Sequence, residues 1–192
     1  GIVVGTRPDC VNDELLDYFV ELNKRYYVMI EYGVESTCND TLRLINRGHN
    51  YASAEEAIQK TARKNLRTAA HLILGLPGES REMILSHADK ISKLPLTAIK
   101  LHQLQLIKGT AMARQYAENP ESFNMMTADE YIELVIDFLE RLNPDIAVER
   151  FVSQSPGNLL IAPNWGLKNF EFVHKIEKRL KERDAWQGRL FS

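Results

Sequence analysis

The segment from His71 to Ser80, which reads His-Leu-Ile-Leu-Gly-Leu-Pro-Gly-Glu-Ser, constrains the fold more than any other stretch of the chain. Its first apolar residues predict a buried strand, and Gly75, Pro77 and Gly78 then predict a tight turn. Ser80 suits the start of a helix. A strand that passes through such a turn into a helix is typical of a ligand-binding edge in α/β proteins. The turn alone is equally consistent with a tight connection, and it is not a Walker loop because no Gly-Lys-Ser/Thr follows.

Strands and helices alternate along the whole chain. Strands are predicted over residues 3–6, 27–34, 68–75 and 97–106, with a last candidate over 146–151. Helices are predicted from Asn12, from Asp40 to Gly48, from a capping box at Ser53, over residues 80–94, from a capping box at Thr127 and over residues 168–183. This order predicts parallel strands joined by right-handed crossovers. Because four or five strands are too few for a closed eight-stranded barrel, we expect an α/β fold that forms a partial, open TIM-like barrel with outer helices.

The length and composition predict one hydrophobic core. The chain has 192 residues, of which 44% are hydrophobic, and this suits a single compact unit better than two full domains. We expect residues 1–152 to form the barrel core. Residues 153–192 begin with a loop rich in Pro, Gly and Asn and end in a charged helix, and we expect them to pack on the barrel as an extension.

Charge and cysteine content limit the partners, the cell compartment and the metal sites that we expect for the protein. The chain has 26 acidic and 24 basic residues, so its totals indicate no field that would gather nucleic acid or an anionic membrane. It has no run of 18 apolar residues and no signal-peptide pattern, which predicts a cytoplasmic protein without a membrane segment. Cys10 and Cys38 fit neither a disulfide framework nor a CxxC metal site, and we expect two buried free thiols. The first residues read as the middle of a strand, which suggests a piece of a longer protein.

Alternation along the predicted strands places polar side chains on one face. Glu31 shares a face with Gly33 and Glu35, His71 with Ile73 and Gly75, and Lys100 with His102. Since helices cover the outside of such a barrel, these groups should point inward, toward a cavity near the carboxyl ends of the strands. Each group also has a structural interpretation. Glu31 suits a structural ion pair with Lys100 equally well, and either histidine taken alone suits a hydrogen-bonded core position.

Five motifs, taken in order, give the chain a specific resemblance. They are Gly5-Thr-Arg-Pro-Asp9, Glu31-Tyr-Gly-Val-Glu-Ser36, Asn46-Arg-Gly-His49, His71-Leu-Ile-Leu-Gly-Leu-Pro-Gly-Glu79, and Ile99-Lys-Leu-His-Gln103 with Lys108-Gly-Thr110. Together they resemble radical S-adenosylmethionine (SAM) proteins. The resemblance is to the branch that contains the Elongator catalytic subunit three and oxygen-independent coproporphyrinogen oxidase, and within it to the bacterial YhcC-type proteins, often labelled Fe-S oxidoreductases. It extends over nearly the whole chain and implies a barrel of the radical SAM type.

The resemblance implies a set of cofactor contacts. Glu35 and Ser36 would contact SAM at its ribose or methionine end, and Arg47 would pair with the SAM carboxylate, which suits a guanidinium. Ile73 would pack on the adenine, and Gly75 belongs to the same motif of the family. His71 replaces the first glycine of that motif and stands where related enzymes can place an Asp on the ribose.

The resemblance also implies substrate contacts and a chemistry. Substrate-side candidates are Arg7, Glu31, Lys100 and His102, and the substrate would be a tRNA or a small molecule. In the family, three cysteines spaced CxxxCxxC hold a 4Fe-4S cluster. An electron donor reduces the cluster, which cleaves SAM to a 5′-deoxyadenosyl radical that abstracts hydrogen from the substrate. This chain has no such cysteine triplet and so no metal ligands for the cluster. We therefore expect part of a radical SAM oxidoreductase that is inactive by itself.

Two other functions remain open on the sequence. The first is a barrel without a cluster that binds a nucleotide or a protein partner. The second is a lyase or hydrolase that uses Glu31, Glu35 and His71 as acid and base groups, with the turn at residues 75–78 holding a phosphate. Activity without iron, reductant or SAM would favour the second.

Overall fold

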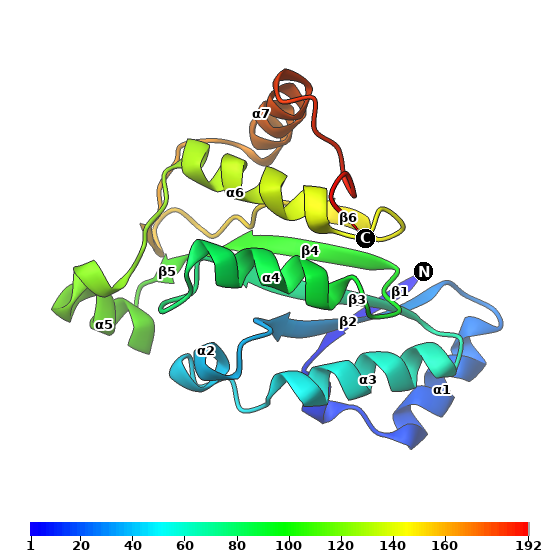
Figure 1. Ribbon diagram of the computed structural model, residues 1–192. Helices are drawn as coiled ribbons and strands as arrows, with labels where there is room; N and C mark the ends of the chain where they lie inside the picture. The colour runs from blue at the N-terminus through cyan, green and yellow to red at the C-terminus, as the bar shows by residue number, and fades with distance from the viewer. Residues whose placement is uncertain (192) are drawn as a thin grey trace.

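A computed structural model describes residues 1–191 and contains one five-stranded sheet in which every neighbouring pair is parallel (Figure 1). The strand order is β1-β2-β3-β4-β6. The strands are β1 (Ile2–Thr6), β2 (Val28–Glu35), β3 (Arg67–Leu74), β4 (Ala98–Gln103) and β6 (Ala147–Arg150). The predicted strands are therefore all present, and their carboxyl ends lie at one edge of the sheet.

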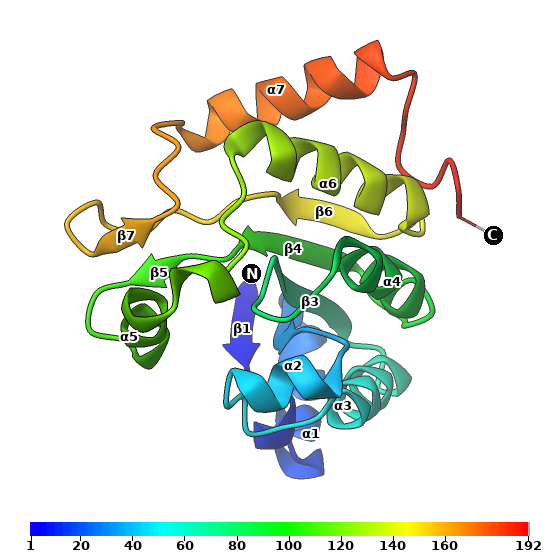
Figure 2. The same cartoon turned by 60° about the vertical axis from the view of Figure 1, so that its left-hand side comes forward.

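Seven α-helices and a small second sheet complete the described residues. The helices are α1 (Asp13–Asn23), α2 (Asn39–Leu44), α3 (Tyr51–Arg63), α4 (Arg81–Ile91), α5 (Ala111–Glu118), α6 (Ala128–Arg141) and α7 (Asn169–Glu182). Two 3-10 turns cover Pro8–Cys10 and Pro120–Ser122. Beside α5, β5 (Leu106–Ile107) pairs antiparallel with β7 (Leu160–Ala162), as Figure 2 shows.

The hydrophobic core lies between one face of the sheet and the helices. Alternate strand residues enter it, among them Ile30, Leu72 and Leu101, each with 1% or less of its surface exposed. The apolar sides of α1, α3, α4 and α6 cover this face, and α7 packs outside α6 (Figures 1 and 2). Because all of these helices lie on the outer face, the opposite face of the sheet is the inner wall of an open barrel. The fold is thus the α/β partial barrel that the sequence predicts.

The helix ends follow short-range signals, with two corrections. The side chains of Asn12, Ser80 and Thr127 cap α1, α4 and α6 as predicted. The cap of α3 is Asn50 and not Ser53, because the Asn50 side chain accepts the Ser53 amide at 2.8 Å and starts the helix earlier.

Several other element bounds also differ from the prediction. α2 ends at Leu44 and not at Gly48, because Asn46 already takes a left-handed conformation with φ of 53°. α4 ends at Ile91, and the predicted strand 97–106 divides into β4 and β5. α5 and β7 were not predicted.

Cys10 and Cys38 are free, but the expectation that both are buried is wrong. Cys10 is exposed at the end of a 3-10 turn, and Cys38 is half-buried at the start of α2. Within residues 1–191, no helix is both long enough and apolar enough to cross a membrane.

Candidate functional site

A hydrogen-bonded charge cluster lies on the inner wall of the barrel. The buried carboxylate of Glu31, on β2, accepts from Nε2 of His71 on β3 at 3.1 Å and forms an ion pair with Lys100 on β4. Lys100 also pairs with Glu149 of β6 at 3.2 Å. The predicted inward face of Glu31, His71 and Lys100 is confirmed. Burial would raise the pKa of Glu31, but Lys100 and His71 outweigh it, so the pKa is lowered and the group is a carboxylate at neutral pH.

The two histidines of this wall are uncharged at neutral pH. The rings of His71 and His102 stack with their centres 5.5 Å apart. Burial lowers the pKa of His71, and the hydrogen bond to Glu31 only partly opposes this. Burial, with the nearby charge of Arg150, lowers the pKa of His102 to about 4. Nε2 of His102 therefore carries a free lone pair, which accepts a hydrogen bond from Nη2 of Arg150.

A second group, at the end of β2, is built around Arg47. Its Nη2 donates to the carbonyl of Gly33 at 2.9 Å and lies 3.0 Å from the carboxylate of Glu35. The side chains of Arg47 and Glu35 are 24% and 17% exposed, so the pair is only partly open to solvent. Gly33 permits this approach because a Cβ at Gly33 would overlap Nη2 of Arg47 and lie 2.7 Å from Oε1 of Glu35.

The backbone at Glu35 is in a conformation that few residues other than glycine adopt. Its φ is 66°, and the pairing of β2 with β3 shifts by one residue between Gly33 and Glu35. This bulge turns the Glu35 carboxylate toward Arg47. Burial raises the pKa of Glu35, and the charge of Arg47 only partly offsets it. The carboxylate is therefore held at some electrostatic cost beside a cation that has further donors to offer.

His49 fixes the orientation of the Arg47 guanidinium. Nε2 of His49 accepts from Nε of Arg47 at 3.2 Å, and Nδ1 of His49 lies 3.2 Å from the carbonyl of Asn50. Nε2 of His49 also lies 3.2 Å from the carbonyl of Gly33. A guanidinium can only donate, so the contact with Arg47 requires the tautomer that carries its hydrogen on Nδ1. Arg47 thus has three protein contacts, and within residues 1–191 no acceptor bonds its Nη1.

Ser36 lies next to Glu35 but belongs to a buried polar ring. Its hydroxyl is fully buried, donates to Oε1 of Glu79 and accepts the amide of Cys38 at 3.0 Å. Nε2 of His87, on α4, donates to the same Glu79 oxygen at 3.1 Å, and Nδ1 of His87 is 2.7 Å from the Thr37 hydroxyl. The ring ties the end of β2 to the turn before α4. The Ser36 hydroxyl therefore has both its partners inside the protein.

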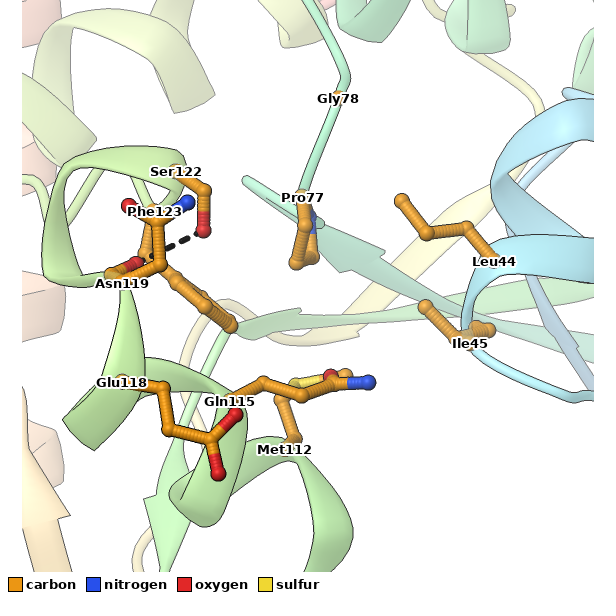
Figure 3. Close-up of a pocket in the computed structure, with 10 residues that line it drawn as sticks. All are labelled: Leu44, Ile45, Pro77, Gly78, Met112, Gln115, Glu118, Asn119, Ser122 and Phe123. Carbon is orange, nitrogen blue, oxygen red and sulfur yellow. Dashed lines mark hydrogen bonds between the residues drawn. The ribbon is translucent and has the colours of Figure 1, made fainter.

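The glycine-rich turn forms one wall of a pocket at the carboxyl edge of the sheet. Gly75 and Gly78 have φ of 90° and 81°, which glycine adopts without strain. The pocket has a volume of about 430 Å³. Figure 3 shows Pro77 and Gly78 of the turn, Leu44 and Ile45 at the end of α2, and a third wall from the α5 region. That wall contains Met112, Gln115, Glu118, Asn119, Ser122 and Phe123. Ile73 packs in the apolar cluster under this pocket, with Leu76 and Phe123.

The remaining candidate, Arg7, lies outside both groups. Its guanidinium pairs with Asp9, with Nε donating to the Asp9 carboxylate at 2.9 Å. The Arg7 side chain is nearly half exposed. It passes close to Gly48 of the Arg-Gly-His motif, where an added Cβ would lie 3.4 Å from Nη2 of Arg7.

The structure therefore brings the predicted residues together in two places. Glu31, His71, Lys100 and His102 form the inner-wall cluster, and Glu35 and Arg47 form the pair at the end of β2. Sequence reasoning missed His49, Glu149 and Arg150 as members of these groups. A signal existed for Arg150, because it lies near the end of the predicted strand 146–151. The structure pairs it in register with Lys100 on the neighbouring strand.

The described residues offer no place for an iron–sulfur cluster. The chain has two cysteines, whereas three thiolates are needed, and residues 1–191 contain no group of three or more His, Cys, Asp or Glu side chains that could hold a metal ion. The donors that are present suit an organic ligand with charged ends.

Comparisons with known proteins match the chain over most of its length. Residues 1–91 match the model of the radical SAM superfamily, and residues 96–182 match the model of the radical SAM C-terminal domain. YtqA of Bacillus subtilis is 37% identical over 191 residues, which are 100% of this chain and 59% of YtqA. YhcC of Escherichia coli K12 is 30% identical over 183 residues, which are 95% of this chain and 59% of YhcC. The chain therefore spans 59% of the length of each of these relatives.

Two matches come from the archaeon Methanocaldococcus infernus. A protein named tRNA uridine(34) acetyltransferase is 25% identical over 186 residues, which are 95% of this chain and 33% of that protein. The solved structure of an Elp3 with an N-terminal deletion has a TM-score of 0.81 at 20% identity and covers 96% of this chain and 42% of that one. The two chains thus share their fold.

Proposed function

The chain belongs to the radical SAM superfamily, and we propose that it is the part of a radical SAM enzyme that holds S-adenosylmethionine and shapes the substrate side of the barrel. The Arg47–Glu35 pair carries this proposal. A guanidinium and a carboxylate lie 3.0 Å apart at the carboxyl edge of the sheet, and each has atoms left for a ligand. The methionine end of SAM has a carboxylate and an ammonium group, which are the complements of these two charges.

The residues of this chain would hold and orient the cofactor. Arg47, already oriented by His49 and the Gly33 carbonyl, would bind the SAM carboxylate, and Glu35 would bind the ammonium group. The apolar pocket beside the turn, with Ile73 beneath it, would suit the adenine. SAM bound here would supply the 5′-deoxyadenosyl group for hydrogen abstraction, provided that an iron–sulfur cluster gives SAM an electron. The three thiolates for that cluster are not among the residues of this chain.

We propose the inner wall as the substrate side. Glu31, Lys100, His71 and His102 would meet the substrate there, with both histidines uncharged and able to accept or donate single hydrogen bonds. A tRNA is the first substrate to test, because one relative is named as a tRNA-modifying enzyme. A small molecule is the other class to test.

Calorimetric titration of SAM into the natural full-length protein and its Arg47→Ala variant tests the proposal. We expect the variant to bind SAM at least about 10-fold more weakly, because a charge-assisted fork is lost. Arg43→Ala is the matched control, since Arg43 is exposed four residues earlier and, among residues 1–191, its ion pair is with the exposed Asp40. Equal SAM affinity in all three proteins would remove Arg47 from the site. Turnover without iron, reductant or SAM would instead favour an acid–base enzyme.

A further inference from the structure

Arg150 lies on the inner wall, at the end of β6. It is half-buried, and its Nη2 donates to Nε2 of His102 on the neighbouring strand. Its Nε is buried and has no hydrogen-bond partner. Within residues 1–191, no carboxylate lies within ion-pair distance of the Arg150 guanidinium, and no acceptor bonds its Nη1.

The neighbouring cation on this wall is neutralised, whereas Arg150 is not. Lys100, in register with Arg150, pairs with both Glu31 and Glu149. The only polar partner of Arg150 among the described residues is His102, a ring that is uncharged at neutral pH and cannot balance a positive charge. The positive charge of Arg150 is therefore not balanced by a negative charge among the described residues, although the side chain is partly desolvated.

An unneutralised, half-buried guanidinium is costly for a folded protein. Leaving a charged donor without an acceptor costs more free energy than leaving a neutral donor without one. A buried polar group of this kind indicates either an unseen solvent contact or a ligand that completes it. Nε is buried, so a ligand can reach only the outer nitrogens of the guanidinium. Water can accept from Nη1, but it cannot balance the charge. An anion can do both, and the guanidinium fork matches the oxygens of a phosphate or a carboxylate.

The position of Arg150 separates it from the proposed cofactor contacts. Arg47 and Glu35 lie at the end of β2, and three strand spacings of about 4.8 Å each separate β2 from β6 in the sheet. Arg150 lies on β6, the edge strand of the sheet, and its guanidinium contacts His102 of β4. A group bound there would belong to a different part of the ligand, or to a different ligand, from the methionine end of SAM.

We propose that Arg150 binds an anionic group of the substrate, a phosphate or a carboxylate, and that His102 holds its guanidinium in place for that contact. The inference rests on the proposed function only in taking the inner wall as the substrate side. His102 acts here as a positioning residue, because its lone pair accepts from Nη2 and fixes the guanidinium so that Nη1 faces the anion.

Titration of the full-length protein with sodium phosphate and, separately, with sodium acetate at constant ionic strength tests this site. The ring C–H signals of His102 in NMR spectra report binding beside Arg150. We expect one or both anions to shift these signals, and Arg150→Gln to raise the dissociation constant at least about 10-fold. Arg150→Lys keeps the charge but loses the fork, so it should weaken binding by less. Arg141→Gln, on the outer side of α6, removes one positive charge elsewhere and should change nothing.

The outcomes separate the ligand classes and the two proposals. Shifts with phosphate alone indicate a phosphate-bearing substrate, and shifts with acetate alone indicate a carboxylate. Absence of shifts, or equal binding by Arg150→Gln and Arg141→Gln, overturns the site. If Arg150→Gln does not fold, the anion affinities of Arg150→Lys and Arg141→Gln are compared instead, and equal affinities overturn the site.

SAM affinity should be unchanged in Arg150→Gln, and a 10-fold loss would place Arg150 in the cofactor site and overturn the proposal. If Arg47→Ala leaves SAM affinity unchanged, the cofactor assignment fails without affecting the anion result.

Discussion

Gly33 controls the geometry of the Arg47–Glu35 pair through the absence of a side chain. A Cβ at this position would overlap the Arg47 guanidinium and press on the Glu35 carboxylate. We therefore expect Gly33→Ala to displace Arg47 and weaken SAM binding by about 10-fold, the effect of losing roughly one charge-assisted hydrogen bond. Calorimetry with SAM measures this directly.

Gly5→Ala is the control for that substitution. Gly5 lies on the same wall, in register with Glu31, and a Cβ there would have no neighbour within 4 Å. SAM affinity should therefore stay at the wild-type value. A loss of affinity in Gly5→Ala, or none in Gly33→Ala, would contradict the assignment of Gly33 as a spacer for Arg47.

His102 should make the fold sensitive to acid. Burial first, and then the charge of Arg150, the ring of His71 and the charge of Lys100, lower its pKa to about 4 from the usual value near 6.5. Between these two values the unfolded chain binds a proton that the folded protein does not, so this contribution to stability is complete above pH 6.5 and is lost as the pH falls toward 4. Because His102 is partly open to solvent, we expect a loss of about 2 kcal/mol rather than the full value of the shift.

Urea unfolding between pH 4 and 7 measures the His102 contribution. In His102→Gln, whose side-chain oxygen can still accept from Arg150, the free energy of unfolding should fall less steeply with acid than in the wild type. His174→Gln is the control, because His174 is exposed on α7. Identical slopes in His102→Gln and His174→Gln would show that His102 titrates normally.

At the scale of elements, the ring around Glu79 joins β2 to the turn before α4. Glu79 and His87 are both buried, and Glu79 accepts from Ser36 and His87. We expect Glu79→Ala to destabilise the fold by about 3 kcal/mol, because two buried donors lose their acceptor and a cavity remains. Glu177→Ala, at an exposed position of α7, should cost less than about 0.5 kcal/mol. Urea unfolding compares them, and a similar small cost for both would mean that the ring contributes nothing to stability.

Elements with strong periodicity could be predicted, and elements that depend on long-range contacts could not. The apolar stripe and capping box of α6 determine that helix locally, and both are present. The bulge at Glu35 was not predictable, since it depends on the pairing of β2 with β3 and on the contact with Arg47. Arg47 lies beyond α2 in the chain. α5 was missed because it has only eight residues, of which one, Ala113, is buried.

The candidate site shows the same division between local and long-range information. Alternation within each strand correctly placed Glu31, His71 and Lys100 on one face, because that periodicity is local. It could not show that Lys100 pairs with the carboxylates of both Glu31 and Glu149. Nor could it show that Arg150 donates to His102 instead, since these contacts depend on how side chains from three strands pack. The burial of the Ser36 hydroxyl against Glu79 likewise joins residues that are 43 positions apart.

The last segment of the described chain is held against α6 by ion pairs and backbone hydrogen bonds. Glu140 is 2% exposed, and its carboxylate pairs with Arg183 at 3.1 Å and with Arg189. The amides of Gly188 and Leu190 donate to the carbonyls of Leu139 and Glu140 at 3.0 and 2.7 Å. The Glu140 carbonyl lies in the last turn of α6, where carbonyls lack the usual amide four residues later, whereas the Leu139 carbonyl also accepts the Leu142 amide at 3.1 Å. α7 and the segment after it are thereby held against the layer of helices outside the barrel.

Glu140→Gln should loosen this attachment while leaving the barrel folded. Arg189 loses its carboxylate, whereas Arg183 keeps Asp137 at 2.6 Å and Glu133 at 2.8 Å, so we expect a cost of about 2 kcal/mol, below that of breaking a fully buried pair. Hydrogen exchange should therefore quicken at residues 185–191 and stay unchanged in β2 and β3. Glu182→Gln is the control, because its pairs with Arg179 and Lys178 are exposed and should contribute less than about 0.5 kcal/mol. Equal exchange in both variants would show that the backbone contacts alone hold the segment, and faster exchange in β2 would show that the barrel depends on it.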